Sequence, residues 1–169
     1  MINLLDKICT HPDFPIQGIT FFDLLPAISE GNIFKNLIDQ LYEASKDYPA
    51  TKIAGIDARG LIFAAPLAYR RNLGFIPIRK ANKLPGKIIV EKYTKEYGTD
   101  NVAIQEDMIT EEDHVLIVDD IIATGGTARA TEKLISRYTK NIRHLFLLEL
   151  NELKGTAKLS FDNRVLYSV

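Results

Sequence analysis

The sequence predicts an α/β domain whose central, mostly parallel sheet is flanked by helices. The apolar runs HVLIVDD (114–120) and IRHLFLLEL (142–150) bracket the helical segment GTARATEKLISRY (126–138). A strand, helix, strand order of this kind is typical of parallel pairing. Both runs are almost continuously apolar, which is typical of strands that are covered on both faces.

The first half of the chain adds a further strand and two helices. Segment 32–45 has apolar residues at helical spacing and predicts an amphipathic helix with one buried stripe. TKIAGI (51–56) predicts a short strand. Segment 61–72 predicts a packed helix, in which Pro66 either produces a kink or lies near the first turn.

Three more segments predict strands in the middle of the chain: GFIPIRK (74–80), KIIVEKY (87–93) and NVAIQE (101–106). The turn residues YGTD (97–100) separate the last two. We therefore expect a hairpin-like excursion over about residues 87–105.

Composition favours one domain over residues 1–169, because 46% of the 169 residues are hydrophobic and no repeat or linker divides the chain. The formal net charge of −1 gives no general electrostatic attraction to nucleic acid or to a membrane. The single cysteine, Cys9, cannot form an internal disulfide, and neither a signal peptide nor a membrane-spanning run is present. These features predict a cytoplasmic protein.

The stretch VDDIIATGGTARA (118–130) predicts a ligand site. Asp119 and Asp120 end an apolar run, so we expect both to face a crevice at the carboxyl end of a parallel strand. Two adjacent carboxylates can accept hydrogen bonds from the neighbouring hydroxyls of a ribose. The stretch therefore predicts ribose binding by this pair of acids.

The segment ATGGT that follows predicts phosphate binding by Ala123, Thr124, Gly125, Gly126 and Thr127. The glycines allow close approach of backbone amides, and the threonines add hydroxyl donors. The helix that begins there directs roughly half a positive charge at the anion. Acid pairs and double glycines also occur in ordinary caps and turns, so the combination of the two halves carries the prediction of a ribose 5-phosphate site.

The same stretch resembles the phosphoribosyl pyrophosphate motif of type I phosphoribosyltransferases, and it lacks the Gly-Lys-Thr ending of a Walker loop. Six further segments resemble successive signatures of the adenine phosphoribosyltransferase family: 13–26, 55–60, 78–86, 93–100, 104–109 and 148–155. The resemblance implies a pentosyltransferase that moves ribose 5-phosphate from Mg²⁺-bound phosphoribosyl pyrophosphate to N9 of adenine. It also implies the type I fold with a small hood at about 1–30 and a flexible lid at about 87–105.

The resemblance assigns the leaving pyrophosphate to two basic segments. In DARG, Arg59 supplies a planar fork of donors, and the backbone of Ala58 and Gly60 adds amides at a helix start. Donors fixed there stabilise the negative charge that develops on the leaving group. The second segment comprises Arg79, Lys80 and Lys83, which by resemblance reach the pyrophosphate of the neighbouring subunit in a homodimer.

The predicted lid contains YTKEYGTD (93–100). Glu96 matches the catalytic carboxylate of the family, which handles the proton near the purine imidazole. It can do so near neutral pH only if lid closure raises its pKa from about 4.3. Tyr97 is expected to shape the same lid, which would exclude water from the activated sugar.

Adenine recognition is assigned by resemblance to four residues. Phe21 stacks on the base and Leu150 lies on its opposite side, while backbone groups near Thr20 and Phe22 read the base edge. Many relatives have an arginine in place of Phe22. This difference puts base affinity or lid contacts in doubt.

Three rival functions remain to be weighed. Transferases for hypoxanthine and guanine usually carry a third acid where this chain has Ala123, which argues against a 6-oxopurine. A xanthine substrate is not excluded by this position, although xanthine transferases lack the YTKEYGTD pattern. A regulator that binds phosphoribosyl pyrophosphate without turnover should carry an added nucleic-acid-binding segment, and none is seen.

A protein-built metal site is not predicted. The three histidines lie far apart without the spacing of metal ligands. We expect Mg²⁺ to arrive with the substrate, bound mainly by hydroxyl, phosphate and water oxygens.

Overall fold

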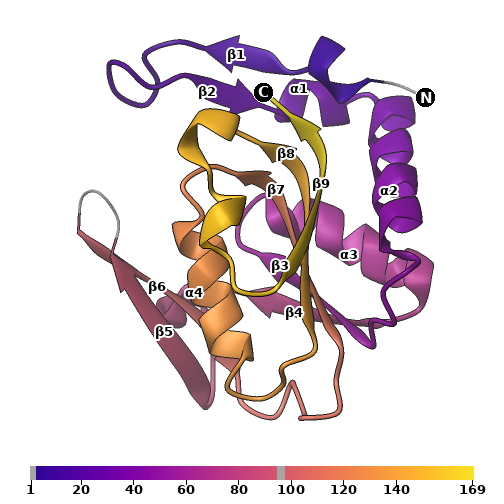
Figure 1. Cartoon of the computed structure of the whole chain (residues 1–169), viewed down its shortest axis with the longest axis vertical. Coiled ribbons are helices and arrows are strands. Elements are labelled where there is room, and N and C mark those ends of the chain that lie inside the picture. The colour runs from indigo at the N-terminus through magenta and orange to yellow at the C-terminus, as the bar shows by residue number, and fades with distance from the viewer. Residues whose placement is uncertain (1–2, 95–97) are drawn as a thin grey trace. The chain divides into compact units, whose positions relative to one another are not determined.

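The computed structural model describes residues 3–94 and 98–169. Contacts within the chain divide it into two units, an N-terminal unit of residues 1–40 and a C-terminal unit of residues 41–169. Figure 1 gives the position of each element along the chain by colour. In the described residues, no helix combines the length and the apolar character needed to cross a membrane.

The N-terminal unit contains short elements. They are the 3₁₀ turn Leu4–Asp6, β1 (Cys9–His11), β2 (Phe21–Asp23), α1 (Leu25–Ile28) and the larger part of α2 (Gly31–Ser45). β1 and β2 pair antiparallel, with His11 opposite Phe21. The apolar spacing of 32–45 predicted α2, whereas β1 and β2 were not predicted, because three residues are too few to show a period of two.

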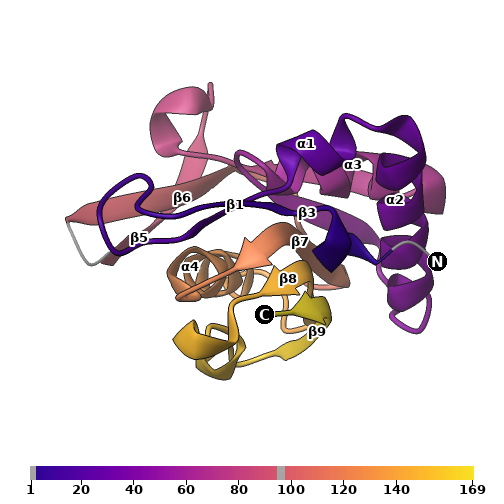
Figure 2. The ribbon, with the colours of Figure 1, turned by 90° about the horizontal axis from the view of Figure 1, so that it is seen from above.

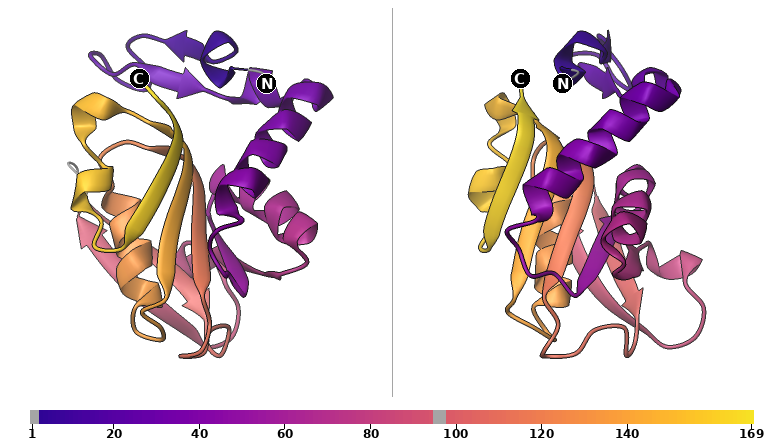
Figure 3. Two further views of the ribbon diagram at one scale, coloured as in Figure 1. Left: turned by 45° about the vertical axis from the view of Figure 1, so that its right-hand side comes forward. Right: turned by 90° about the vertical axis from the view of Figure 1, so that its right-hand side faces the viewer.

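The C-terminal unit is built on one parallel sheet with the strand order β4-β3-β7-β8-β9. Its strands are β3 (Lys52–Ile56), β4 (Gly74–Ile78), β7 (Val115–Ile122), β8 (Ile142–Glu149) and β9 (Asp162–Ser168). The views in Figure 3 show the strands running side by side with a steady twist. The predicted α/β class with a parallel sheet is confirmed, although β9 was not predicted.

Two helices cover opposite faces of this sheet: α3 (Gly60–Arg71) and α4 (Gly126–Ile135). On β3, Gly55 faces α3, because a Cβ built on it would lie 2.6 Å from the Cβ of Ala64. Its neighbours Ala54 and Ile56 belong to the core cluster that contains Leu134 of α4. Adjacent strand residues point to opposite faces, so the two helices lie on opposite sides, as Figure 2 also shows. Pro66 lies inside α3 rather than in its first turn.

The expected hairpin is present as β5 (Ile88–Thr94) and β6 (Thr99–Gln105), which pair antiparallel. Val102 and Ile104 of β6 are buried in the same core cluster as the inner face of α4. A bridge between Arg79 and Ala103 joins the hairpin to the end of β4. The remaining elements of this unit are three 3₁₀ turns: Ala81–Lys83, Asn151–Leu153 and Thr156–Lys158.

Candidate functional site

The site residues of the C-terminal unit gather where the sheet connections diverge. β3 and β7 are neighbours, but the chain leaves β3 through α3 towards β4 and leaves β7 through α4 towards β8. Ligands of open α/β sheets bind at such a switch point, outside the carboxyl ends of the strands. A hollow opens there, and its walls are Asp119 and the continuous segment 121–128.

The backbone of the predicted phosphate loop bends sharply before α4. Gly125 has a φ of +77° and occupies the N-cap of the helix. A Cβ on it would lie 2.5 Å from the carbonyl oxygen of Gly155, so the position requires glycine for two independent reasons. Gly126 has an ordinary φ and is the first residue of α4. A Cβ on Gly126 would lie 3.7 Å from the Tyr93 ring, at ordinary van der Waals distance.

Two residues to which the sequence assigned no individual role, Gly155 and Lys158, pack against this loop. A Cβ on Gly155 would overlap the carbonyl oxygen of Ala123, so two stretches of backbone pack directly against each other here. Lys158 donates a hydrogen bond from Nζ to the carbonyl of Thr124 at 2.8 Å. The sequence shows that Gly155 ends the segment LELNELKG (148–155), but it does not show that this glycine packs against the distant backbone of Ala123.

The two adjacent acids have different surroundings. Asp119 lines the hollow, and its Oδ1 accepts a hydrogen bond from the backbone N–H of Asp120 at 2.9 Å. Asp120 is only 3% exposed and forms an ion pair with Arg59. Asp119 is among the residues that line the hollow and Asp120 is not, and the expectation that both acids face a crevice stays a prediction. The role of Asp120 as a ribose ligand stays a prediction.

Both carboxyl groups have raised pKa values. Burial raises the pKa of Asp119 well above its usual range, and the charge of Asp120 raises it further. Burial also raises the pKa of Asp120, while the Arg59 guanidinium partly opposes that rise. The acids at the end of β7 are thus held in an environment that penalises their charge until a cation or a hydroxyl donor compensates.

The DARG segment lies directly against these acids. Arg59 Nε is 2.7 Å from Asp120 Oδ2, and Arg59 immediately precedes α3. A Cβ on Gly60 would lie 2.6 Å from Asp119 Oδ1, so only glycine allows this approach. The peptide bond between Asp57 and Ala58 is cis. The structure thus brings the predicted pyrophosphate segment beside the predicted ribose acids.

In the second basic segment, Arg79 contacts the DARG segment and Lys80 contacts the hairpin. Arg79 Nε lies 3.1 Å from Asp57 Oδ2, which belongs to the DARG segment. Lys80 Nζ lies 3.1 Å from Asp100 Oδ2 on the hairpin. Lys83 lies in the following 3₁₀ turn and is exposed.

The residues assigned to adenine lie in both units. In the N-terminal unit, Phe21 and Phe22 are half-buried in β2, and the Phe21 ring meets Phe14 edge to face with centroids 5.3 Å apart. Thr20 precedes β2 and is exposed. In the C-terminal unit, Leu150 donates its backbone N–H to Ile122 at 3.1 Å.

The predicted catalytic carboxylate, Glu96, and the lid residue Tyr97 lie outside the described residues. Over 3–94 and 98–169, no group of three or more histidine, cysteine, aspartate or glutamate side chains is arranged to hold a metal ion.

Comparison with known proteins identifies the family. Residues 28–160 match the phosphoribosyl transferase domain family. An adenine phosphoribosyltransferase of Maridesulfovibrio salexigens is 45% identical over 160 residues, which is 94% of each chain. The crystal structure of adenine phosphoribosyltransferase from Thermoanaerobacter pseudethanolicus superimposes with a TM-score of 0.93 at 39% identity and covers 98% of both chains.

A third relative was crystallised with ligands. Adenine phosphoribosyltransferase from Saccharomyces cerevisiae, complexed with D-2,5-dideoxy-2,5-imino-altritol 1,6-bisphosphate and adenine, has a TM-score of 0.90 and 39% identity over 96% of each chain. The sequence resemblance, the fold and these relatives agree. The chain therefore belongs to the phosphoribosyltransferase domain family and, within it, to the adenine phosphoribosyltransferases.

Proposed function

We propose that this chain transfers ribose 5-phosphate from phosphoribosyl pyrophosphate to N9 of adenine, giving AMP and pyrophosphate for purine salvage. One observation carries the proposal. Asp119 and the 121–128 segment share one hollow, and Arg59 and Gly60 lie against the two acids at its edge. A ribose 5-phosphate that carries pyrophosphate on C1 has groups suited to each of these parts.

The 5′-phosphate is assigned to Ala123, Thr124, Gly125, Gly126 and Thr127. The left-handed Gly125 turns the backbone at the start of α4, where the helix directs free amides and partial positive charge outward. The ribose hydroxyls are assigned to Asp119, with Asp120 as the second acid. An ionised carboxylate accepts hydrogen bonds from both hydroxyls of a diol, and the diol then compensates the charge that burial disfavours.

The leaving pyrophosphate is assigned to Ala58, Arg59 and Gly60. As the bond from C1 to the pyrophosphate oxygen breaks, negative charge accumulates on the leaving group, and Arg59 stabilises it with a planar set of donors. Arg79, Lys80 and Lys83 are assigned to the same group as cations. Their contribution from a neighbouring subunit requires a homodimer, which we include in the proposal.

Adenine is assigned to Thr20, Phe21, Phe22 and Leu150, with an aromatic ring and an aliphatic side chain on the two faces of the base. Backbone carbonyls can accept hydrogen bonds from its amino group without a dedicated polar side chain. The proton near the purine imidazole is assigned to Glu96, with Tyr97 shaping the lid around it. Glu96→Gln should therefore abolish most turnover while leaving phosphoribosyl pyrophosphate binding intact.

Mg²⁺ is proposed to bind together with the substrate. The carboxylate of Asp119 is a hard oxygen donor in the hollow, which fits a cation held otherwise by the hydroxyl and phosphate oxygens of the substrate. The ion neutralises charge on the leaving group when it is bound. We also propose a cytoplasmic location, supported by the exposed and unpaired Cys9.

Initial rates with adenine, hypoxanthine, guanine and xanthine test the substrate assignment. We expect adenine to be preferred strongly, since Ala123 offers no acid to a 6-oxopurine. Preference for any other base would overturn the adenine assignment. Binding of phosphoribosyl pyrophosphate without turnover of any base would favour a ligand-sensing regulator instead.

A further inference from the structure

A pair of hydroxyls joins the β5–β6 hairpin to the first turn of α4. The Tyr93 hydroxyl of β5 lies 3.0 Å from the Thr127 Oγ1, and either oxygen can be the donor. The Tyr93 ring also lies over the helix start, because a Cβ on Gly126 would be 3.7 Å from it. Gly126 and Thr127 line the hollow, so Tyr93 lies close to two of its lining residues.

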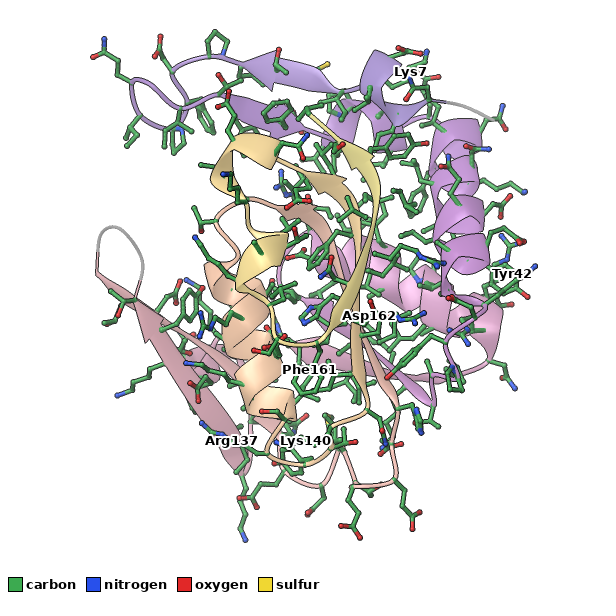
Figure 4. All side chains as sticks on the ribbon, viewed as in Figure 1. Lys7, Tyr42, Arg137, Lys140, Phe161 and Asp162 are labelled. Carbon is green, nitrogen blue, oxygen red and sulfur yellow. The ribbon has the colours of Figure 1, made fainter. Side chains whose placement is uncertain are left out.

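The position of β5 along α4 does not depend on this hydroxyl. At the other end of the helix, Arg137 donates to the carbonyl of Val90 at 3.3 Å and pairs with Glu91. Figure 4 labels Arg137 there, beside Lys140. The Tyr93 ring packs against the core cluster between the hairpin and the helix. Removal of the Tyr93 oxygen alone should therefore leave the hairpin in place.

A phosphate bound in the hollow would decide which of the two hydroxyls donates to the other. A threonine hydroxyl has one proton to donate and two lone pairs that can accept. A phosphate dianion can only accept hydrogen bonds, so the Thr127 hydroxyl must be the donor in any hydrogen bond between the two. The oxygen of Thr127 can then accept only from a neighbour, and the Tyr93 hydroxyl, 3.0 Å away, can donate to it.

We propose that Tyr93 is a positioning residue for the 5′-phosphate: its O–H donates to Thr127 and turns the Thr127 proton into the hollow. The inference rests on the proposed function, which places a phosphate there. Two hydrogen bonds aligned in one chain polarise each other, so the Thr127 bond to phosphate is strengthened as well as oriented. Tyr93 does not touch the reacting atoms.

Tyr93→Phe tests this proposal with AMP and adenosine as paired probes, which differ only in the phosphate. Titration calorimetry should give an AMP Kd about three- to tenfold higher than that of the unsubstituted protein, with adenosine affinity unchanged. The KM for phosphoribosyl pyrophosphate should rise by a similar factor while kcat is retained, because the interaction is made equally in the ground and transition states. Tyr69→Phe is the matched control, since Tyr69 is 90% exposed on α3.

A double-mutant cycle with Thr127→Val tests whether Tyr93 acts through Thr127 or through a general loss of packing between the hairpin and α4. If Tyr93 acts through Thr127, then Tyr93→Phe has no further effect on AMP affinity in the Thr127→Val background. Additive effects, equal losses for AMP and adenosine, or an unchanged AMP affinity would each overturn the role of Tyr93. A wild-type protein that binds AMP no more tightly than adenosine would overturn the phosphate site itself and the role of Tyr93 with it.

Discussion

Arg59 Nε lies 2.7 Å from Asp120 Oδ2 and ties the segment after β3 to the end of β7. The helix dipole disfavours an arginine directly before α3, and the almost fully buried carboxylate of Asp120 compensates for this. Arg59, which is predicted to bind pyrophosphate, is thus paired with Asp120, which is predicted to bind ribose.

Replacement of Arg59 should reduce both stability and activity, but for separable reasons. Arg59→Ala leaves Asp120 as a buried, unpaired carboxylate, so the free energy of unfolding should fall by about 3 kcal/mol. AMP formation should fall at least about 100-fold, because the leaving group loses its fork of donors. Addition of Asp120→Asn should recover most of the stability in urea unfolding without recovering the rate. A double variant that regains normal turnover would show that Arg59 does not act on the pyrophosphate.

Asp119→Asn should make the ligand-free protein more stable at pH 7 and nearly inactive. Burial and the charge of Asp120 raise the pKa of Asp119 in the folded state, so the ionised form is disfavoured there. The wild type therefore loses stability as the pH rises above the unfolded pKa of about 3.8, whereas the amide variant does not. Below that pH the two proteins should unfold at similar urea concentrations. A variant that is less stable at pH 7 would contradict this view of the acid pair.

Gly155→Ala should damage the phosphate loop although it lies outside the motif. The added Cβ would overlap the carbonyl oxygen of Ala123, so the loop must shift. We expect a loss of about 2 kcal/mol in unfolding free energy and a rise of at least about tenfold in the KM for phosphoribosyl pyrophosphate. Gly31→Ala is the control, because a Cβ there meets nothing within 4 Å. Equal kinetics for the two variants would remove the supporting role of Gly155.

Asp113 should stabilise the fold above about pH 4 without affecting the site. Although burial raises its pKa, the Lys52 ammonium and donors from Thr110 and Thr51 lower the pKa to about 2. A depressed pKa gives stability that is present above the unfolded pKa and is lost as the pH falls through the folded one, here between about 3.8 and 2. Asp113→Asn should cost about 2 kcal/mol at pH 7.

The matched control for Asp113 is Glu43→Gln, since Glu43 forms an exposed ion pair with Lys46. This control should change the unfolding free energy by less than about 1 kcal/mol. The difference between Asp113→Asn and wild type should shrink when urea unfolding is repeated at pH 3. A constant difference across this range would show that the carboxylate charge is not what stabilises the fold.

Strong periodic patterns allowed most of the C-terminal unit to be predicted. The apolar runs at 114–120 and 142–150 correspond to β7 and β8. Segment 32–45 corresponds to α2, the larger part of which belongs to the N-terminal unit. β9 was missed because it begins with the polar residues Asp162, Asn163 and Arg164 at a sheet edge, where no residue of the strand is fully buried and no apolar run is required. Edge strands give little signal in composition.

The site could be predicted as a set of residues but not as a geometry. The motif placed Asp119 and 123–127 in one stretch, and the structure brings them to one hollow. The ion pair of Asp120 depends on Arg59, and the support of the phosphate loop depends on Gly155. Local sequence carries no record of either contact.

The central claim is that a sugar diol lies on Asp119 while its phosphate lies on the amides and hydroxyls at the start of α4. A crystal structure of the AMP complex tests this most directly. We predict ribose hydroxyl oxygens within hydrogen-bond distance of Asp119 and the phosphate against residues 123–127. AMP bound away from this hollow, or bound there with the phosphate on Arg59 and the base at the helix start, would contradict the account.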